Sequence, residues 1–301
     1  MNKLILVESP TKAKKIQKYF NDGTIVKSSF GHIMDLDKKT LSINVSDNFK
    51  PSYKIIPGKE KIIKDILHYR NDYQVILAAD DDREGDSIAW HCGNLMKLDY
   101  NQKNRIIFHE ISKDSILDSL QNIHKLNLNS VNSQQARRII DRLVGFSLSP
   151  LLWKHIQTDK KGLSAGRVQS TLLSMLKDHE DKINNYIPQT ITNCQGNFKS
   201  KKFSLSSEYI SETSYQPEEL CKQLQLNIHF KIKDILTYNG KEYPPKPFIT
   251  STLQRTAQKS LGFSIRKTMD IAQKLFENGK ITYMRTDSTC VSKIFQKKLS
   301  Y

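Results

Sequence analysis

The chain has 301 residues, 38% of them hydrophobic, and its 47 Lys and Arg residues outnumber 31 Asp and Glu residues, giving a formal net charge of +16. This length exceeds the roughly 250 to 300 residues at which single cores stop growing, so we expect several domains. No apolar run reaches the roughly 18 residues of a membrane helix and no signal peptide is recognisable, which predicts a soluble, cytoplasmic protein without membrane contact. The charge favours a polyanionic partner such as nucleic acid, and the alternative is a basic protein without one.

The first segment alternates strands with helices. Residues 4–7 form a short apolar run typical of a buried strand, and Ser9-Pro10 then marks the start of a helix over about 10–20. A second strand is predicted over 75–79, with a helix over 87–98 behind it. Strands that alternate with helices predict a mostly parallel sheet with helices on its faces.

The rest of the chain changes character twice. Residues 127–185 are mainly helical in pattern, residues 186–246 show short alternating runs typical of antiparallel strands, and the prolines at 244, 245 and 247 mark a boundary or hinge. The expected elements are helices over 132–146, 165–179, 250–261 and 265–276, and strands over 190–198, 203–209, 228–238 and 281–286. The fold class predicted is therefore multidomain α/β.

Acidic residues follow both predicted strands of the first segment. Glu8 comes directly after the first strand and Asp80 after the second, and the carboxyl ends of parallel strands meet at one edge of a sheet. Asp80, Asp82 and Glu84 alternate with other residues, so an extended segment would point them to one side. Such carboxylates suit Mg²⁺, while the alternative is a solvated acidic loop.

Tyr283 and Arg285 lie two positions apart near the end of the chain. In a strand they would share one face, and the guanidinium would help to form the phenolate and stabilise a phosphoryl transition state. With the acidic residues, this inventory fits transfer of a phosphodiester through a phosphotyrosine. The alternative is an ordinary packed aromatic residue.

Further charged residues lie at predicted helix starts or on helix faces. Lys12 falls in the first turn of the first helix, where an anion such as phosphate is favoured, although it also fits a solvated lysine face. Arg137 and Asp141 are spaced for an i,i+4 pair, and Arg167 and Gln169 follow a helix start. Phosphate contacts and solvated charge both remain open for this last group.

Seven ordered segments give the chain a resemblance to the type IA DNA topoisomerases, in the bacterial topoisomerase I branch. They are residues 6–14 (LVESPTKAK), 31–36 (GHIMDL), 79–91 (ADDDREGDSIAWH), 135–142 (QARRIIDR), 149–153 (SPLLW), 163–170 (LSAGRVQS) and 281–288 (ITYMRTDS). The resemblance implies a Toprim domain over 1–126 with an inserted segment near 31–55, a helical DNA-groove domain over 127–185, a β-rich arch over 186–246 and the start of a tyrosine-bearing domain over 247–301.

The resemblance also assigns roles to residues. Tyr283 would be the nucleophile that keeps the 5′ phosphate, Arg285 would steady the scissile phosphate, and Lys12 would assist there. Glu8 would be the general acid and would join the Mg²⁺ acids Asp80, Asp82 and Glu84. The residues that would line a groove for single-stranded DNA are Arg105, Arg137, Asp141, Arg167 and Gln169.

The implied activity is relaxation of negatively supercoiled DNA through a transient single-strand break. The phosphotyrosine stores the bond energy and the chain shows no G-x-x-x-x-G-K-[ST] loop, so no ATP is expected. A complete family member would act as a monomer at the nucleoid. Family chains continue past the tyrosine, so the sequence is expected to be a fragment or a truncated product. The alternatives are a Toprim nuclease or primase that does not use Tyr283, and a catalytically inactive DNA-binding module.

Overall fold

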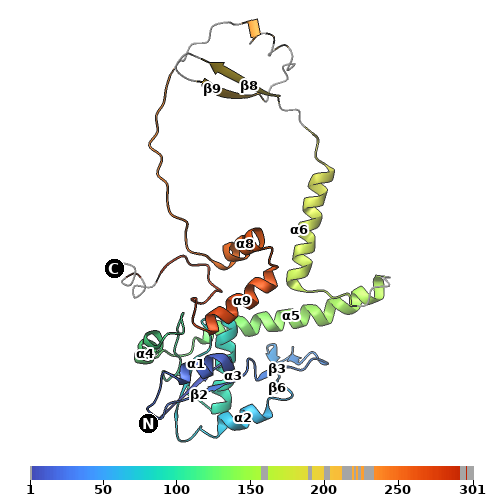
Figure 1. Cartoon of the computed structure of the whole chain (residues 1–301). Coiled ribbons are helices and arrows are strands. Elements are labelled where there is room, and N and C mark those ends of the chain that lie inside the picture. The colour runs from blue at the N-terminus through green and yellow to red at the C-terminus, as the bar shows by residue number, and fades with distance from the viewer. Residues whose placement is uncertain are drawn as a thin grey trace. The chain divides into compact units, whose positions relative to one another are not determined.

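The computed structural model describes residues 2–156, 162–188, 192–199, 204–211, 219, 222, 225–226, 234–291 and 296. The chain divides into two compact units (Figure 1). The main unit comprises Met1–Arg167 and Pro245–Tyr301, and the second unit comprises Val168–Pro244. Over the described residues, no helix is both long enough and apolar enough to cross a membrane. The four-domain division expected from the resemblance stays a prediction.

A parallel three-stranded sheet forms the centre of the main unit. Its order is β2 (Ile25–Ser28), β1 (Lys3–Val7), β7 (Gln74–Leu77), and β1 runs parallel to both neighbours. Leu4 pairs with Ile25 on one side and with Val75 on the other. The predicted parallel sheet is therefore confirmed.

The helices that follow the strands begin near the predicted positions. In α1 (Pro10–Gln17), Ser9 is the N-cap and proline opens the helix as expected, but the helix ends three residues earlier than predicted. The helix α3 (Arg83–Met96) begins four residues before the predicted start, because the Asp82 side chain accepts a hydrogen bond from the backbone N–H of Gly85 and caps it. The remaining helices of this region are α2 (Glu60–Leu67) and α4 (Lys113–Gln121).

Two small antiparallel pairs lie between β2 and α2 in the chain. They are β3 (Met34–Leu36) with β6 (Tyr53–Ile55), and β4 (Ile43–Asn44) with β5 (Lys50–Pro51). These pairs lie within residues 34–55, and the inserted segment expected near residues 31–55 stays a prediction.

Both faces of the sheet are covered by hydrophobic core. Alternate residues of β1 point to opposite sides, so Ile5 packs in a cluster with Ile16 and Phe276, whereas Leu4 packs in another with Ile88. Phe276 belongs to α9 (Ile265–Glu277), and burial of its ring contributes about 2–3 kcal/mol. The C-terminal part of the main unit is thereby anchored on the face of the sheet that α1 also covers.

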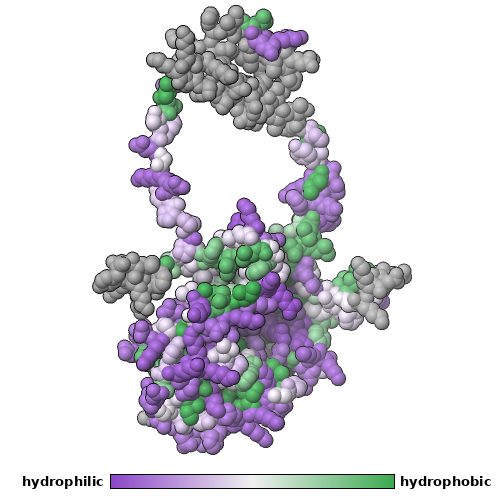
Figure 2. All heavy atoms as spheres, in the orientation of Figure 1, coloured by the Kyte–Doolittle hydropathy of each residue, from purple (hydrophilic) through white to green (hydrophobic). Residues whose placement is uncertain are grey.

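Two helices in the C-terminal part of the main unit match their predicted ranges closely. They are α8 (Thr250–Leu261) and α9, whose C-caps are Gly262 and Asn278. Figure 2 shows hydrophobic residues gathered over these helices on an otherwise mainly hydrophilic main unit. The exposed hydrophobic side chains there include Leu261, Ile265 and Leu275.

The helix α5 (Leu128–His155) is much longer than the predicted 132–146 and continues past Pro150. It is fixed to the β3 region by two arginines. Arg138 Nη2 donates to both carboxylate oxygens of Asp35 at 2.8 Å, and Arg142 Nη1 donates to the backbone carbonyl oxygen of Asp37 at 2.7 Å. These bonds explain how one face of a largely exposed helix is held.

The second unit contains most of α6 (Arg167–Asn184) and the antiparallel pair β8 (Thr192–Lys199) and β9 (Ser204–Ser211). These elements confirm the helix and the two strands predicted nearby. Of the predicted strand over 228–238, residues 228–233 lie outside the described residues, and 234–238 form no strand.

Candidate active site

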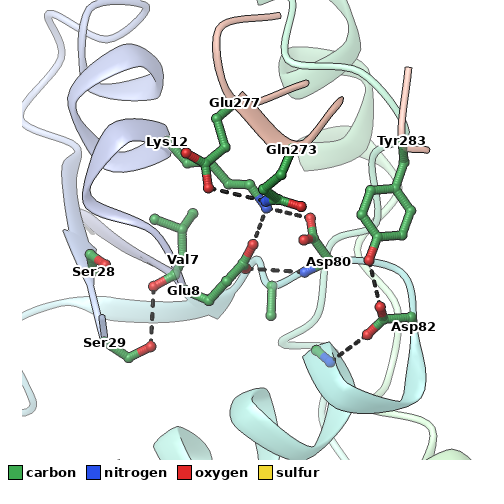
Figure 3. A network of polar contacts seen from close by, with 12 residues as sticks. Val7, Glu8, Lys12, Ser28, Ser29, Asp80, Asp82, Gln273, Glu277 and Tyr283 are labelled. Carbon is green, nitrogen blue, oxygen red and sulfur yellow. Dashed lines mark hydrogen bonds and ion pairs between the residues drawn. The ribbon is translucent and has the colours of Figure 1, made fainter. Parts of the chain in front are cut away.

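The carboxyl ends of β1 and β7 bring two acidic residues together, as predicted. The backbone N–H of Asp80 donates to Glu8 Oε2 at 3.1 Å, and Lys12 Nζ donates to both Glu8 Oε1 and Asp80 Oδ1 (Figure 3). The Lys12 side chain is completely buried. Glu8, Lys12 and Asp80 therefore form one internal ionic cluster at the edge of the sheet.

Lys12 does not occupy the solvated helix face that its spacing also allowed. Its ammonium group lies 4.8 Å from the centroid of the Phe276 ring, beneath the C-terminal part of the main unit. The pKa of Asp80 is raised to about 7: burial is the largest cause, the negative charge of Glu8 adds to it, and Lys12 partly opposes both. In this structure Lys12 offsets the repulsion between two carboxylates, and a phosphate contact is not part of its geometry.

Residues 80–84 do not form one extended segment, because α3 begins at Arg83, which corrects the prediction based on alternation. Asp82 is the N-cap of α3 and Glu84 lies in the first helical turn. Glu84 Oε2 accepts a hydrogen bond from Arg285 Nη1 at 3.1 Å, and its Oε1 lies 3.6 Å from His32 Nε2. The interaction with His32 and the charge and hydrogen bond of Arg285 lower the pKa of Glu84 to about 2.

Tyr283 reaches this cluster from the far end of the chain. Its hydroxyl donates to Asp82 Oδ2 at 2.5 Å, its backbone N–H donates to the carbonyl oxygen of His109 at 2.8 Å, and its ring centroid lies 5.1 Å from that of Phe276. Figure 3 shows the phenol pointing at Asp82, beside Asp80. The structure thus unites the predicted nucleophile with the predicted acids.

The pKa of Tyr283 is raised, which differs from the expectation that Arg285 would favour the phenolate. Burial is the largest cause, the hydrogen bond donated to Asp82 and the charges of Asp80 and Asp82 add to it, and Arg285 only partly opposes them. The guanidinium itself is bound to carboxylates, 3.4 Å from Asp82 and 3.1 Å from Glu84. Tyr283 is therefore a neutral hydrogen-bond donor in this arrangement.

No strand forms over residues 281–286, which the structure describes in full, so the predicted strand is wrong. The backbone is held instead by Thr250 at the start of α8. The Thr250 hydroxyl lies 2.8 Å from the carbonyl oxygen of Met284 and 3.0 Å from that of Thr286, and it accepts from the Thr286 N–H at 3.0 Å. Without a neighbouring strand, these contacts replace ladder hydrogen bonds.

Six of the predicted site residues line one cavity of about 280 Å³. They are Glu8, Asp80, Asp82, Glu84, Tyr283 and Arg285. A neighbouring cavity of about 580 Å³ shares Asp82, Glu84 and Arg285 and is also lined by Arg137. The predicted catalytic and metal residues thus face a common space, with Lys12 buried behind it.

The carboxylates have the right chemistry for Mg²⁺, since hard oxygen ligands are what that ion prefers. Across the described part of the chain, however, no three His, Cys, Asp or Glu side chains are arranged as a metal cluster. Each acid is engaged elsewhere: Glu8 and Asp80 with Lys12, and Asp82 and Glu84 with Arg285. The carboxylate oxygens are therefore suitable ligands for Mg²⁺, and in this structure their negative charge is balanced by Lys12 and Arg285.

The structure brings three of the five predicted DNA-groove residues together and not the other two. Arg137 Nε lies 3.9 Å from Asp141 Oδ2, so the i,i+4 pair is present, and Arg167 Nε donates to Asp141 Oδ1 at 3.0 Å. Gln169 belongs to the second unit and is not placed relative to these residues. Arg105 is only 1% exposed, so the prediction that it lines a groove conflicts with its burial.

The sequence interpretation overlooked Arg138, Asp86 and Thr250. Arg138 lines the larger cavity together with Arg137. The two adjacent arginines in the sequence were a signal that could have identified it. Asp86 was part of the acidic run, but nothing local marks it as the buried partner of Arg105. No local pattern indicates that Thr250 holds a segment more than thirty residues away.

Comparison with known proteins gives the same assignment. The family model described as DNA topoisomerase matches residues 125–300, and the Toprim domain model matches residues 3–111. Full-length topoisomerase I from Thermotoga maritima is similar in structure, with a TM-score of 0.81 and 37% sequence identity over 98% of this chain and 51% of that one. The chain spans about half the length of that relative. The chain belongs to the DNA topoisomerase family, in the bacterial type IA topoisomerase I branch.

Proposed function

We propose that the chain carries the strand-cleaving centre of a type IA topoisomerase, with Tyr283 as its nucleophile. The observation that supports this most directly is the hydrogen bond from the Tyr283 hydroxyl to Asp82, which joins residues 201 positions apart in the sequence. A core aromatic residue would have no need to end in a cavity lined by five acids and an arginine. The geometry is that of a nucleophile beside a proton acceptor.

In the proposed reaction, Tyr283 Oη attacks the scissile phosphorus and a phosphorus–oxygen bond forms. The bond from phosphorus to the 3′ oxygen of the DNA breaks and the phenolic proton passes to Asp82. Glu8, in the protonated form that this step requires, supplies its proton to the departing 3′ oxygen. Arg285 would hold a non-bridging phosphate oxygen once DNA displaces its carboxylate partners. Resealing reverses these steps and needs no ATP, because the phosphotyrosine keeps the bond energy.

Mg²⁺ would be held by Asp80, Asp82 and Glu84, with Glu8 nearby, and it would supply positive charge to the substrate phosphate. Lys12 would keep Glu8 and Asp80 close together whether or not the ion is bound, because it is buried between them. Its own contribution to the phosphate would then be electrostatic and indirect.

The substrate would be the single-stranded part of negatively supercoiled DNA. Arg137 lines the larger cavity and would contact the strand. Asp141 pairs with both Arg137 and Arg167, which brings Arg167 to the same place. Gln169 stays a predicted contact. The net charge of +16 supports a polyanionic partner. A complete protein of this kind would relax supercoils as a monomer on the bacterial nucleoid.

The test is transfer of end-labelled single-stranded DNA to the protein in the presence of Mg²⁺. A 5′-phosphotyrosine leaves the downstream fragment on the protein, so we expect labelled protein from 3′-labelled DNA and a free fragment from 5′-labelled DNA. Tyr283→Phe should lose the adduct completely, because it has no hydroxyl to attack the phosphorus. Tyr243→Phe, at an exposed tyrosine, is the matched control and should retain it.

Other outcomes of the same experiment would identify the alternatives. Cleaved DNA without labelled protein, unchanged in Tyr283→Phe, would indicate a nuclease. Salt-sensitive binding without cleavage would indicate a DNA-binding module. Either result would contradict the proposed role of Tyr283.

A further inference from the structure

Arg105 has one of the largest completely buried side chains in the described structure, yet it is a permanent cation. It lies on a short extension beside β7, where the Ile106 N–H donates to the carbonyl oxygen of Leu77 at 2.9 Å. On its other side, its own N–H and carbonyl exchange hydrogen bonds with His124. The backbone of Arg105 is therefore fixed on both edges, and its side chain extends beneath the site.

The guanidinium contacts both ends of the acidic loop, which we define as Asp80–Asp86. At the entry, Nη1 donates to the carbonyl oxygen of Ala79 at 2.7 Å and Nη2 donates to that of Asp80 at 2.8 Å. At the exit, Nε donates to Asp86 Oδ1 at 3.2 Å. One rigid, planar group thus joins the segment that follows β7 to the first turn of α3.

The acidic loop is tight enough for its side-chain directions to depend on this backbone. A β-carbon on Gly85 would lie only 2.2 Å from the Asp80 carbonyl oxygen, the same oxygen that Arg105 binds. Asp82 closes the loop by accepting from the N–H of Gly85. A shift at the Asp80 carbonyl would therefore move the carboxylates of Asp80 and Asp82 together.

We infer that Arg105 is a positioning residue: its guanidinium sets the backbone of the acidic loop and thereby aims Asp80, Asp82 and Glu84 at the space in front of Tyr283. The inference rests on the proposed function for what these carboxylates do. Arg105 would contribute to cleavage without touching DNA. Lysine cannot replace it, because an ammonium group is a single point of charge and cannot bridge two carbonyls and a carboxylate.

The test compares Arg105→Lys with Arg70→Lys, a control at a partly exposed arginine in the turn after α2. We expect Arg105→Lys to bind single-stranded DNA with a Kd within about twofold of the unmodified chain, because no phosphate contact is lost. We expect its single-turnover rate of adduct formation to fall at least about tenfold, because the carboxylates are misaligned. If Arg105 served only general stability, DNA binding and the rate of adduct formation would decline together.

Hydrogen exchange of the loop amides gives a second readout that does not depend on activity. Peptides covering residues 78–88 should exchange at least about tenfold faster in Arg105→Lys, while peptides covering β1 should not change. Asp86→Asn removes the carboxylate at the exit and keeps its shape, so it should accelerate exchange in the same peptides. It serves as the test if Arg105→Lys does not fold.

Several results would overturn the inference. Weaker DNA binding with a smaller dependence on salt would show that Arg105 contacts phosphate directly. Unchanged loop exchange, or an unchanged cleavage rate, would show that the contacts to Ala79, Asp80 and Asp86 position nothing. If the unmodified chain forms no adduct, the proposed function fails, whereas hydrogen exchange still decides whether Arg105 fixes the loop.

Discussion

The acidic loop and the tyrosine segment, residues 281–286, contribute to the same cavity but are held by different kinds of contact. The loop is fixed from beneath by the buried guanidinium of Arg105. The tyrosine segment is fixed mainly by the neutral hydroxyl of Thr250, one backbone bond to His109 and the half-exposed side chain of Arg285. The bond from Tyr283 to Asp82 and the packing of Tyr283 and Met284 in the core cluster with Phe276 add to these contacts. The acidic loop is therefore part of the sheet region itself, whereas the tyrosine segment comes from the C-terminal part of the main unit and packs against that region.

The difference has an energetic consequence. A buried hydrogen bond to a charged group contributes about 1.5–3 kcal/mol, a neutral one about 0.5–1.5 kcal/mol, and an exposed ion pair at most about 1 kcal/mol. Each bond from Arg105 to the acidic loop therefore contributes more than each bond from Thr250 to the tyrosine segment.

The largest effect is expected from Gly85→Ala, which should disrupt the acidic loop. The new methyl group would lie 2.2 Å from the Asp80 carbonyl oxygen, so the backbone must shift. A misplacement of catalytic groups by about 1 Å reduces catalysis about 100-fold, so we expect a loss of that order in single-turnover assays of adduct formation. Gly145→Ala, where the nearest atom would be 4.0 Å away, is the control and should retain activity. Equal activity of both variants would contradict the tight loop.

A smaller effect is expected from Thr250→Val, which loosens the tyrosine segment without changing its shape much. The variant loses the bonds to Met284 and Thr286, each contributing about 1 kcal/mol. We expect adduct formation to fall about tenfold and the melting temperature of the chain to fall by a few degrees. Thr256→Val, on the exposed side of the same helix, should leave the rate unchanged. An unchanged rate in Thr250→Val would contradict the role of Thr250 in holding the tyrosine segment.

His91 in α3 offers a test with almost no expected effect on cleavage. The pKa of His91 is lowered to about 4, mainly by burial and then by the charge of His32, while the charge of Asp35 partly opposes the shift. Among the described residues, His91 Nδ1 has no hydrogen-bond partner. The pKa of His91 in the folded state lies below its ordinary value of 6.5. Neutral His91 therefore makes its full contribution to the free energy of unfolding above pH 6.5, and this contribution is lost as the pH falls toward 4. It amounts to about 3 kcal/mol at most.

The measurement is urea unfolding of the chain at several pH values between 6.5 and 4.5, followed by tryptophan fluorescence. Trp90 and Trp153 both lie in the main unit, so the signal reports on that unit. The loss of stability toward low pH should be smaller in His91→Gln than in the unmodified chain. A His91 titration midpoint near its ordinary value, seen by NMR, would contradict the prediction.

Much of the fold follows from local pattern. The ranges of α8 and α9, the parallel pairing of β1 with β7 and the β8–β9 pair were all predictable, because hydrophobic periodicity and helix caps act over a few residues. The 281–286 segment was not, since its apolar alternation resembles a strand but no partner strand adjoins it among the described residues. Strand formation depends on a neighbour that the segment itself does not encode.

The sequence by itself determined the chemical inventory: a tyrosine followed by an arginine, an acidic run after a strand, and the segments that indicate a type IA topoisomerase. Only the tertiary structure decided the positions of the cations. Lys12 and Arg105 resemble surface residues in the sequence, because most lysines and arginines are exposed. They are buried here because carboxylates and carbonyls from distant parts of the chain enclose them, and such long-range partners leave no periodic signal.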